Sequence, residues 1–467
     1  MIVETESTPR WRSLLATVQS WRSQVRVERV YLVVALVWGV LLVFVTPPLQ
    51  SFDELAHYYR AWSIAEAELV VPPSGSIALP VGAEDLTKRF PYAPIARGQQ
   101  KVDTHTVWAQ LGAPLGSRSV KSSSFAASYG PIGYLPQAVG INVTRVFGGS
   151  PLLALYLARL CNLIAAVLLT YFGLRLLPFA RLAVCLVALL PITMMEMASV
   201  SPDALLLGGC IFFSGLVVAC ASKASLSRRD IALLAFSAVV LLNVKPGYAV
   251  LSLLLLLLVP RQFGSRLKYF LTVFGSVIAS GLLALVFLKL ASNQTQTLIL
   301  MMGADNHINS MEQLKHVLMH PFAFARAIGA TINQLGMFFL RQSVAAYAWG
   351  QLNIGDAVML VAAIGVAAVL AAGERVSFPR WRRAVVLAVA LLAFVVVSLG
   401  LYVANTAVAS PVIIGLQGRY FTPSVVLAFV GLAGFPFRKR WLVPAVVGVV
   451  ILLLIVTNLR TLLLYYY

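Results

Sequence analysis

The sequence predicts an all-α polytopic membrane protein, and three observations lead to this fold class. Of the 467 residues, 60% are hydrophobic and only 11% are charged, and the mean hydropathy is +0.86. These values lie far outside the range of soluble domains. Long apolar runs recur along the chain, and Arg and Lys cluster in alternate loops between them. We therefore expect one transmembrane domain built from roughly eleven helices.

The N-terminal part is expected to lie in the cytoplasm and then enter the membrane. Within residues 1–29, the stretch WRSLLATVQSWRSQVRVER places apolar and Arg side chains on different faces of a helix, which is typical of a segment lying on the inner leaflet. The apolar run 30–48 is long enough to cross a bilayer, and no small-residue cleavage site follows it. This run is predicted to be a retained signal anchor that begins the transmembrane domain, 30–467.

Further apolar runs have the length and composition of membrane spans. They lie at about 152–175, 182–198, 203–222, 230–244, 246–260, 269–290, 354–372, 384–405, 420–436 and 441–459. With a cytoplasmic N-terminus, the basic clusters at 175–181, 223–229, 261–268, 375–383 and 438–440 all fall in cytoplasmic loops, as the positive-inside rule requires. Much of the net charge of +19 therefore reflects topology, and no nucleic acid is expected as a partner beside the lipid bilayer.

The same count places two long polar segments, about 49–150 and 291–353, on the extracytoplasmic side. Residues 131–147 are only moderately apolar, so they are predicted to form a helix parallel to the membrane. The stretch 70–94 is rich in Pro and Gly and is expected to be irregular structure over a membrane-facing site.

The stretch SFDELAHYYR carries the first candidate catalytic residues. Asp53 and Glu54 follow the first span by a few residues, at the outer boundary of the hydrocarbon. A carboxylate there loses hydration and can act as a base. The alternative is a solvated helix start, because Ser51 or Asp53 could cap a helix whose first turn favours acids.

A second acidic position lies in MMEMASVSPDALLL. Glu196 and Asp203 fall at the same predicted membrane face as Asp53. Ser201 and Pro202 also form an ordinary helix start, in which Asp203 is favoured by the helix dipole. Taken alone, this stretch is interpreted as a helix start.

Two cations stand apart from the cytoplasmic clusters. Lys245 in NVKPGY and Arg419 in GLQGRYFTP fall near the outer face, against the positive-inside bias, so a compensating group is expected there. A phosphate would suit both side chains, and Gly418 would let the backbone approach such a ligand closely. The alternatives are snorkelling to lipid headgroups and pairing with an acid.

The sequence gives little support for a cofactor. His307, His316 and His320 share the second outer segment, but no HExxH motif accompanies them, and a solvated amphipathic helix explains their spacing as well. No cofactor is firmly predicted, and a divalent cation stays an alternative. No nucleotide-binding motif is present. The cysteines lie inside apolar runs and are interpreted as packing residues.

Five stretches together resemble a known family. They are TPPLQSFDELAHYYRAWSIAEAELV, SYGPIGYLPQAVG, LLPITMMEMASVSPDALLLGG, NVKPGY and GLQGRYFTP. In content and order they resemble a bacterial integral-membrane family catalogued as a domain of unknown function. That family is similar to the GT-C glycosyltransferases, the superfamily of protein mannosyltransferases, aminoarabinose transferases and oligosaccharyltransferases. The resemblance spans about residues 30–460.

The resemblance implies a GT-C fold, a polyprenyl-phosphate sugar donor that enters from the membrane, and an envelope glycan or lipid acceptor on the outer side. Asp53 matches the superfamily's base, with Glu54 beside it, and Asp203 is a secondary catalytic candidate. Lys245 and Arg419 would bind the donor phosphate. Direct displacement of this kind inverts the anomeric configuration.

Neighbouring residues in the same motifs are predicted to line the acceptor or donor pocket. They are His57, Arg60, Tyr129, Gln417 and Tyr420. The expected location is the bacterial inner membrane, with the site facing outward.

Two other functions stay open. A transporter or flippase of lipid-linked saccharide would also use outer cations, but it needs polar residues that continue to the inner leaflet. The spans show few buried charges, Lys289 being the main one near an end, and no inverted repeat is evident. An O-antigen-type polymerase would also use outer Arg residues, and its oligosaccharide donor would distinguish it.

Overall fold

A computed structural model describes residues 26–71, 76–117, 119–301, 308–348, 352, 354–371, 378–433 and 442–467. Over these ranges the chain is mostly helical, as the composition predicts. The amphipathic segment expected within 1–29 lies almost entirely outside the described residues.

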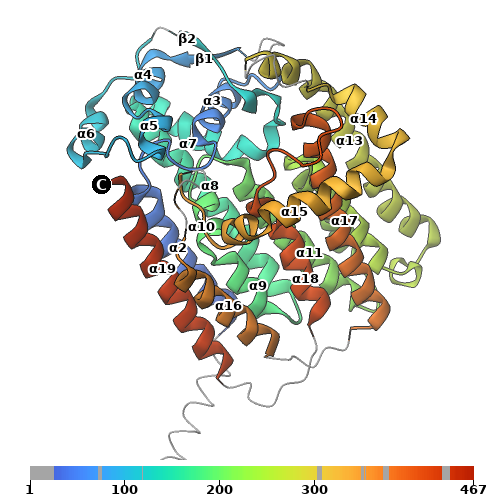
Figure 1. Cartoon of the computed structure of the whole chain (residues 1–467). Helices are drawn as coiled ribbons and strands as arrows, with labels where there is room; N and C mark the ends of the chain where they lie inside the picture. The colour runs from blue at the N-terminus through green and yellow to red at the C-terminus, as the bar shows by residue number, and fades with distance from the viewer. Residues whose placement is uncertain are drawn as a thin grey trace, which may run out of the picture.

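In the described part of the chain, six helices are long and apolar enough to cross a membrane. They are α2 (Val27–Val45), α8 (Pro151–Leu176), α11 (Pro202–Ala221), α13 (Arg266–Met301), α17 (Arg380–Asn405) and α19 (Val443–Tyr466). The shorter apolar helices are η6 (Pro246–Leu257) and α16 (Asp356–Ala371). In Figure 1, α2 and α19 run side by side along one edge of the bundle, and α8 and α11 lie inside it.

Several predicted spans are interrupted helices. The run at 182–198 forms α9 (Arg181–Ala188) and α10 (Pro191–Met197), and the run at 420–436 forms η10 (Gly418–Phe421) and α18 (Thr422–Leu432). The run at 230–244 forms α12 (Arg228–Phe236), a π-helical turn η4 (Ser237–Leu241) and η5 (Leu242–Val244). Such breaks are tolerated inside a membrane protein where side chains satisfy the freed backbone groups.

The first polar segment forms a cap over one end of the bundle (Figure 1). Its elements are α3 (Glu54–Ala65), β1 (Ser76–Pro80), α4 (Val81–Arg89), α5 (Tyr92–Ala96), α6 (Thr104–Ala109), η1 (Gln110–Gly112), β2 (Ser119–Ser123), η2 (Phe125–Ser128), η3 (Pro131–Tyr134) and α7 (Leu135–Val146). β1 pairs antiparallel with β2, with Ala78 opposite Lys121.

The expectation of irregular structure over 70–94 is therefore wrong for most of that stretch. Pro80 and Pro91 each stand immediately before a helix, where a missing N–H costs nothing. Ile77 and Leu79 alternate with more exposed residues and bury one face of β1.

The second polar segment also contains more helix than expected. α13 continues to Met301, and α14 (Ser310–Met319) and α15 (Pro321–Val344) follow it. Figure 1 shows α15 crossing the bundle at a steep angle to α17 and α18. The C-terminal end of α15 reaches the turn that begins η10.

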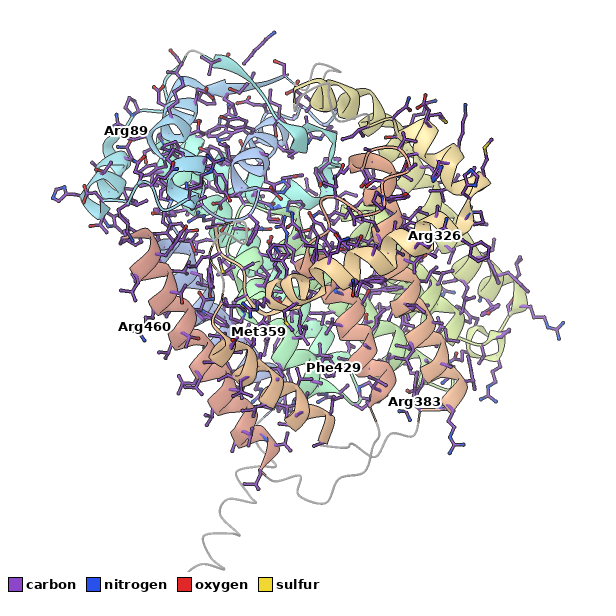
Figure 2. The ribbon with its side chains drawn as sticks, in the orientation of Figure 1. Arg89, Arg326, Met359, Arg383, Phe429 and Arg460 are labelled. Carbon is purple, nitrogen blue, oxygen red and sulfur yellow. The ribbon has the colours of Figure 1, made fainter. Side chains whose placement is uncertain are left out.

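Arg181, Arg382 and Arg383 lie at the end of the bundle opposite the cap. Arg181 pairs with Glu28 at the start of α2, at 3.8 Å. Arg382 donates to the carbonyl of Ala221 at the end of α11. In Figure 2, Arg383 lies at this lower end of the molecule, whereas Arg89 lies in the cap. Which end of the bundle faces the cytoplasm stays a prediction of the positive-inside rule.

Close packing of α7 on α8 depends on Gly140. A Cβ atom there would lie 2.4 Å from the backbone carbonyl of Leu157, a position that no real side chain occupies. We expect Gly140→Ala to reduce the free energy of unfolding by about 1–3 kcal/mol, because the helices must separate. Thermal unfolding in detergent measures this effect. Gly448→Ala on α19, where nothing lies within 4 Å, is the control, and equal melting temperatures for the two variants would contradict this packing.

Candidate functional site

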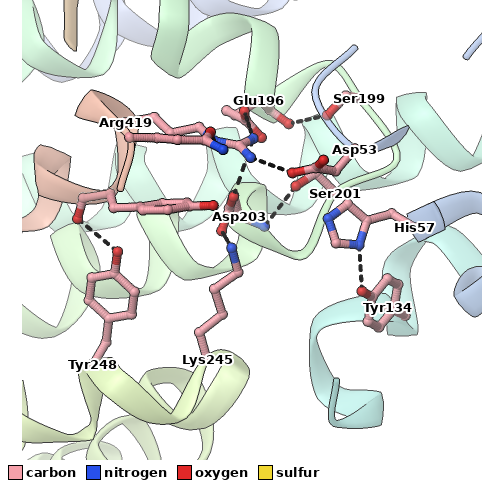
Figure 3. A network of polar contacts seen from close by, with 12 residues as sticks. Asp53, His57, Tyr134, Glu196, Ser199, Ser201, Asp203, Lys245, Tyr248 and Arg419 are labelled. Carbon is pink, nitrogen blue, oxygen red and sulfur yellow. Dashed lines mark hydrogen bonds and ion pairs between the residues drawn. The ribbon is translucent and has the colours of Figure 1, made fainter. Parts of the chain in front are cut away.

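Arg419 lies at the centre of a cluster of ionised side chains where the bundle meets the cap (Figure 3). Its Nη2 atom is 2.6 Å from Asp53 Oδ2, and its Nη1 atom is 2.5 Å from Glu196 Oε1. The same Nη1 atom lies 3.8 Å from Asp203 Oδ2. The Nε atom donates to Gln417 Oε1 at 2.7 Å. One guanidinium thus joins acids from two regions that are far apart in the sequence, the turn before α3 and the stretch from Glu196 to Asp203.

Lys245 extends the cluster on the side of Asp203. The Lys245 Nζ atom is 2.5 Å from Asp203 Oδ1. It also lies over the rings of Tyr129 and Tyr420, at 5.5 and 5.3 Å from their centroids, within the range of cation–π attraction. The residue stands at the break between η5 and η6, so its ammonium group is presented by irregular backbone inside the bundle.

The turn between α2 and α3 presents Asp53 to the cluster. Asp53 occupies the N-cap position of α3, but its side chain makes no capping hydrogen bond and contacts Arg419 instead. Its backbone is left-handed, with φ of 54°, which is uncommon outside Gly. The simple helix-cap interpretation of Asp53 is therefore wrong for its side chain.

Asp203 lies at a helix start and also belongs to the cluster. Ser201 caps α11 by accepting a hydrogen bond from the Asp203 N–H at 3.2 Å, and Pro202 occupies the first turn, as expected for a helix start. The Asp203 side chain nevertheless pairs with Lys245 and belongs to the cluster. A helix start and membership of the ion-pair cluster thus coincide at Asp203.

The turn that carries Arg419 is fixed against α15. The Gly418 N–H donates to Gln342 Oε1 at 2.9 Å, and Ser343 Oγ donates to the Gly418 carbonyl at 3.2 Å. A Cβ atom on Gly418 would lie 2.1 Å from the Phe339 carbonyl oxygen. Gly418 was expected to allow close approach of a ligand, but the close neighbour is the backbone of α15.

The cluster carries one more acid than base. The acids Asp53, Glu196 and Asp203 bring three negative charges, and Arg419 and Lys245 bring two positive charges, so the formal net charge is −1. Of the alternatives for the two cations, pairing with acids is the one observed. Their expected role in phosphate binding stays a prediction.

Asp53 is the most accessible of the three acids. Its side chain is 15% exposed, compared with 2% for Glu196 and 8% for Asp203. A small pocket adjoins the cluster. It is lined by Ile192, Thr193, Glu196, Asp203, Leu206, Leu207, Tyr248, Arg419, Tyr420 and Thr422. Glu196, Asp203 and Arg419 are the cluster members that line this pocket, together with both polar and apolar side chains.

Glu54 lies outside this cluster although it is adjacent to Asp53 in the chain. Its carboxylate is fully buried and forms a two-pronged ion pair with Arg159, at 2.7 Å to Nε and 2.5 Å to Nη2. Both oxygens are therefore bonded away from Arg419. The prediction of Glu54 beside Asp53 as a catalytic residue is not supported by this geometry.

Arg60 does not reach the pocket either. Its guanidinium donates to the backbone carbonyls of Glu68, Leu69 and Tyr129 and to the hydroxyl of Ser63. These contacts tie the end of α3 to the following turn and to the bend at Tyr129 that follows η2. The side chain stabilises the cap and is not a lining residue of the pocket.

His57 lies beside the cluster in a fully buried position (Figure 3). Its Nδ1 atom is 2.7 Å from the Tyr134 hydroxyl, and its ring meets that of Tyr129 edge-on. Burial lowers the pKa of His57 from 6.5 to about 4, although the charge of Asp53 acts in the opposite direction. The imidazole is therefore neutral near pH 7.

The depressed pKa of His57 predicts a pH-dependent stability. Between about pH 6.5 and pH 4 the unfolded chain binds a proton that the folded protein does not, so stability falls as the pH is lowered through this window. The shift corresponds to a maximum loss of roughly 3 kcal/mol. We expect wild type to lose more unfolding free energy than His57→Gln between about pH 7 and pH 4.5, measured by thermal unfolding in detergent. Parallel losses in the two proteins would contradict a buried neutral imidazole.

Two buried charged residues in or next to the cluster were not predicted as site residues. Glu196 was noted at the correct membrane face, and its place in an apolar segment just before a second acid was the available signal. Arg159 lies in the predicted span at about 152–175, whereas Lys289, near the end of the span at 269–290, was expected to be the main charge within the spans. Arg159 is in fact completely buried in α8, so an Arg within an apolar run was the stronger signal.

The histidine pair and the cysteines lie away from the cluster. The rings of His316 and His320, on and after α14, are 5.0 Å apart, and His307 lies outside the described residues. Within the described ranges, no group of three or more His, Cys, Asp or Glu residues is arranged to hold a metal ion. Cys161, Cys185, Cys210 and Cys220 are free thiols within helices.

Comparison with known proteins identifies one family. The model of the family described as "Predicted membrane protein (DUF2142)" matches residues 36–428. The chain belongs to this family. No curated protein and no solved structure matches the chain. The matched range of this DUF2142 protein includes every member of the Arg419 cluster, whereas α19 lies beyond it.

Proposed function

We propose that this DUF2142 protein is a membrane glycosyltransferase with a GT-C-like helical bundle. It would transfer a sugar from a polyprenyl-phosphate donor to an envelope glycan or lipid acceptor. The observation that carries this proposal is the meeting of Asp53, Asp203, Lys245 and Arg419, which come from four distant segments, in one cluster beside a pocket. Perturbed acids and bases that converge on a pocket are typical of active sites.

The charge distribution supports an extracytoplasmic site. The cluster lies where the bundle meets the cap, and the basic loops lie at the other end. Because basic loops favour the cytoplasm, the cap and the cluster would face outward in a bacterial inner membrane. A lipid-borne donor could reach that level from the bilayer, and a water-borne acceptor from the cap.

The proposed reaction is a direct displacement. The acceptor hydroxyl oxygen bonds to the anomeric carbon, and the bond between that carbon and the donor's phosphate oxygen breaks with its electron pair on the phosphate. The hydroxyl proton passes to Asp53, the most accessible acid, and the anomeric configuration inverts. Taking up this proton changes the formal charge of the cluster from −1 to zero.

Lys245 is better placed than Arg419 to contact the leaving phosphate. The nitrogen atoms of Arg419 already donate to Gln417, Glu196 and Asp53. The ammonium group of Lys245 has three N–H donors, and Asp203 is its ion-pair partner among the described residues. In this proposal Arg419 holds the acids in place, and Lys245 stabilises charge that develops on the phosphate.

Lys245→Met is therefore expected to weaken the use of the donor. The variant keeps the length of the side chain but leaves Asp203 with Arg419 as its nearest cation, at 3.8 Å. We expect kcat/KM for the donor to fall by about 100-fold, equivalent to roughly 3 kcal/mol of transition-state stabilisation. Initial rates at varied donor concentration measure the effect. A change confined to the acceptor KM would contradict contact between Lys245 and the phosphate.

A donor panel tests the proposed activity. Purified protein is incubated with polyprenyl-phosphate monosaccharides and, separately, with polyprenyl-linked oligosaccharides, in the presence of envelope glycan acceptors. Release of polyprenyl phosphate from a monosaccharide donor is expected. Use of oligosaccharide donors alone would indicate a polymerase, and tight binding of every donor without turnover would favour a transporter.

A further inference from the structure

α8 contributes no side chain to the Arg419 cluster, yet two of its residues hold the backbone that presents the acids. Arg159 and Asn162 are both completely buried. They are three residues apart on a helix, so they lie on the same face. This face of α8 meets the turn after α2 and the turn before α11.

Arg159 fixes the end of α2. Its Nη1 atom donates to the carbonyls of Val43 and Thr46, each at 2.8 Å, and its Nη2 atom donates to the carbonyl of Pro47 at 2.9 Å. The two remaining donors bind the carboxylate of Glu54. All five N–H groups of the guanidinium are therefore used. The chain from the last turn of α2 to the first residue of α3 is thus held at both ends by one side chain.

Glu54 carries this link onward to the second acidic turn. Its Oε1 atom accepts the Val200 N–H at 3.0 Å, and its Oε2 atom accepts the Ser51 N–H at 3.4 Å. Ser51 lies two residues before Asp53, and Val200 lies three residues before Asp203. The Arg159–Glu54 pair thus sets the distance between the two turns.

Asn162 holds the second turn directly. Its Nδ2 atom donates to the carbonyls of Ser199 and Ser201, at 2.7 and 2.8 Å. Gln137 of α7 also donates to the Ser201 carbonyl, at 3.1 Å. Because the Ser201 hydroxyl accepts the Asp203 N–H, fixing this turn fixes the start of α11 and the direction of the Asp203 side chain.

We infer that Arg159 and Asn162 are positioning residues that hold Asp53 and Asp203 at the correct separation on either side of Arg419. The left-handed backbone of Asp53 agrees with this role, because such a conformation persists only where the surroundings fix it. The inference rests on the proposed function for its catalytic meaning. The geometry can be tested without any transfer assay.

A thiol placed at position 53 reports that geometry. In Asp53→Cys, the new thiol lies beside Arg419, so its pKa should fall below the ordinary value of about 8.5. The pH dependence of its alkylation by a small maleimide measures this pKa. Cys161, the only native cysteine in the described ranges that is not buried, is replaced by Ala in every variant. Asn162→Ala and Arg159→Lys are each expected to raise the midpoint by about one pH unit as the thiol moves away from the guanidinium.

Arg175→Lys is the matched control, because Arg175 is an exposed residue in the last turn of the same helix. It should leave the alkylation midpoint unchanged. Monodisperse elution in detergent identifies variants that fold. If Arg159→Lys does not fold, the alkylation midpoint of Asn162→Ala, the milder change, tests the inference. An unshifted midpoint in a folded Asn162→Ala or Arg159→Lys protein overturns the inference.

A second readout connects the geometry to catalysis. In the Asp53 background, we expect Asn162→Ala to lower kcat at least 10-fold while the donor KM changes less than about threefold, because the base is misplaced but the phosphate contact remains. Equal losses in Arg175→Lys would overturn the inference. Absence of transfer in wild type would instead contradict the proposed function. The positioning role of Arg159 and Asn162 would then be tested by the alkylation measurement alone.

Discussion

Asp53→Asn is expected to lower kcat for sugar transfer by about 100-fold to 10,000-fold, the range typical of removing a general base. The amide keeps the size of the side chain and can still contact Arg419, but it cannot accept the acceptor's proton. The donor KM should change little, because Lys245 and its partners remain in place. Initial rates with a polyprenyl-phosphate monosaccharide measure both constants.

Asp103→Asn is the matched control for this substitution. Asp103 lies in the cap and accepts hydrogen bonds from the N–H groups of His105 and Thr106 at the start of α6, away from the cluster. The hydrogen bond from the Thr106 hydroxyl, together with these N–H bonds, holds the pKa of Asp103 below its ordinary value, so the control also replaces an ionised carboxylate. Asp53→Asn with an unchanged kcat would remove Asp53 as the base and leave Glu196 and Asp203 as the other acids of the cluster that could take the proton.

Arg419→Met is expected to destabilise the protein by about 3–5 kcal/mol, because it leaves buried carboxylates without their counter-ion. Glu196 is 2% exposed, and its Oε1 atom lies 2.5 Å from the guanidinium. The variant should also lose measurable transfer, since Asp53 is no longer held in place. Thermal unfolding in detergent gives the loss of stability independently of activity.

Arg341→Met controls for the loss of an ordinary surface ion pair. Arg341 pairs with Asp356 at 2.7 Å, but the Asp356 side chain is 89% exposed, and such pairs contribute little. The double variant Arg419→Met/Glu196→Gln should recover part of the stability lost in Arg419→Met, because one buried charge is removed. No recovery in the double variant would contradict the electrostatic origin of the loss.

The long spans could be predicted because their signal is local. α2, α8, α11, α17 and α19 each follow from a continuous apolar run with polar residues at its ends. The interrupted segments could not be predicted in detail, since hydropathy reports that a run is buried but not whether its backbone is α-helical. The break at Lys245, followed by Pro246, was the visible sign of the change from η5 to η6.

The members of the cluster could be found because each is a charge in an unusual place. Asp53, Lys245 and Arg419 fall near one predicted membrane face, and the structure brings them together as expected. Their catalytic roles stay predictions. The sequence could not separate Asp53 from Glu54, because adjacent residues share the same local signal. The Glu54 carboxylate is bound by the distant Arg159, and the left-handed backbone at Asp53 turns the Asp53 carboxylate toward Arg419 instead.

The second outer segment shows a different limit of prediction from a single sequence. α14 and α15 lie in a stretch that reads as a polar loop, and the contact of α15 with Gly418 depends on residues about 75 positions apart, as in the bond from Ser343 to Gly418. A single sequence contains no signal for such a contact. The reason for Gly at 418 therefore became visible only when α15 was in place.

The central claim is that the Arg419 cluster converts a lipid-linked sugar at one membrane face. Proteoliposomes that carry a radiolabelled polyprenyl-phosphate monosaccharide in the leaflet facing the cap, with acceptor on that side, test it most directly. We predict that wild type releases polyprenyl phosphate and labels the acceptor, and that Asp53→Asn does neither. Appearance of the intact donor in the opposite leaflet, with no labelled acceptor and no effect of Asp53→Asn, would contradict the account.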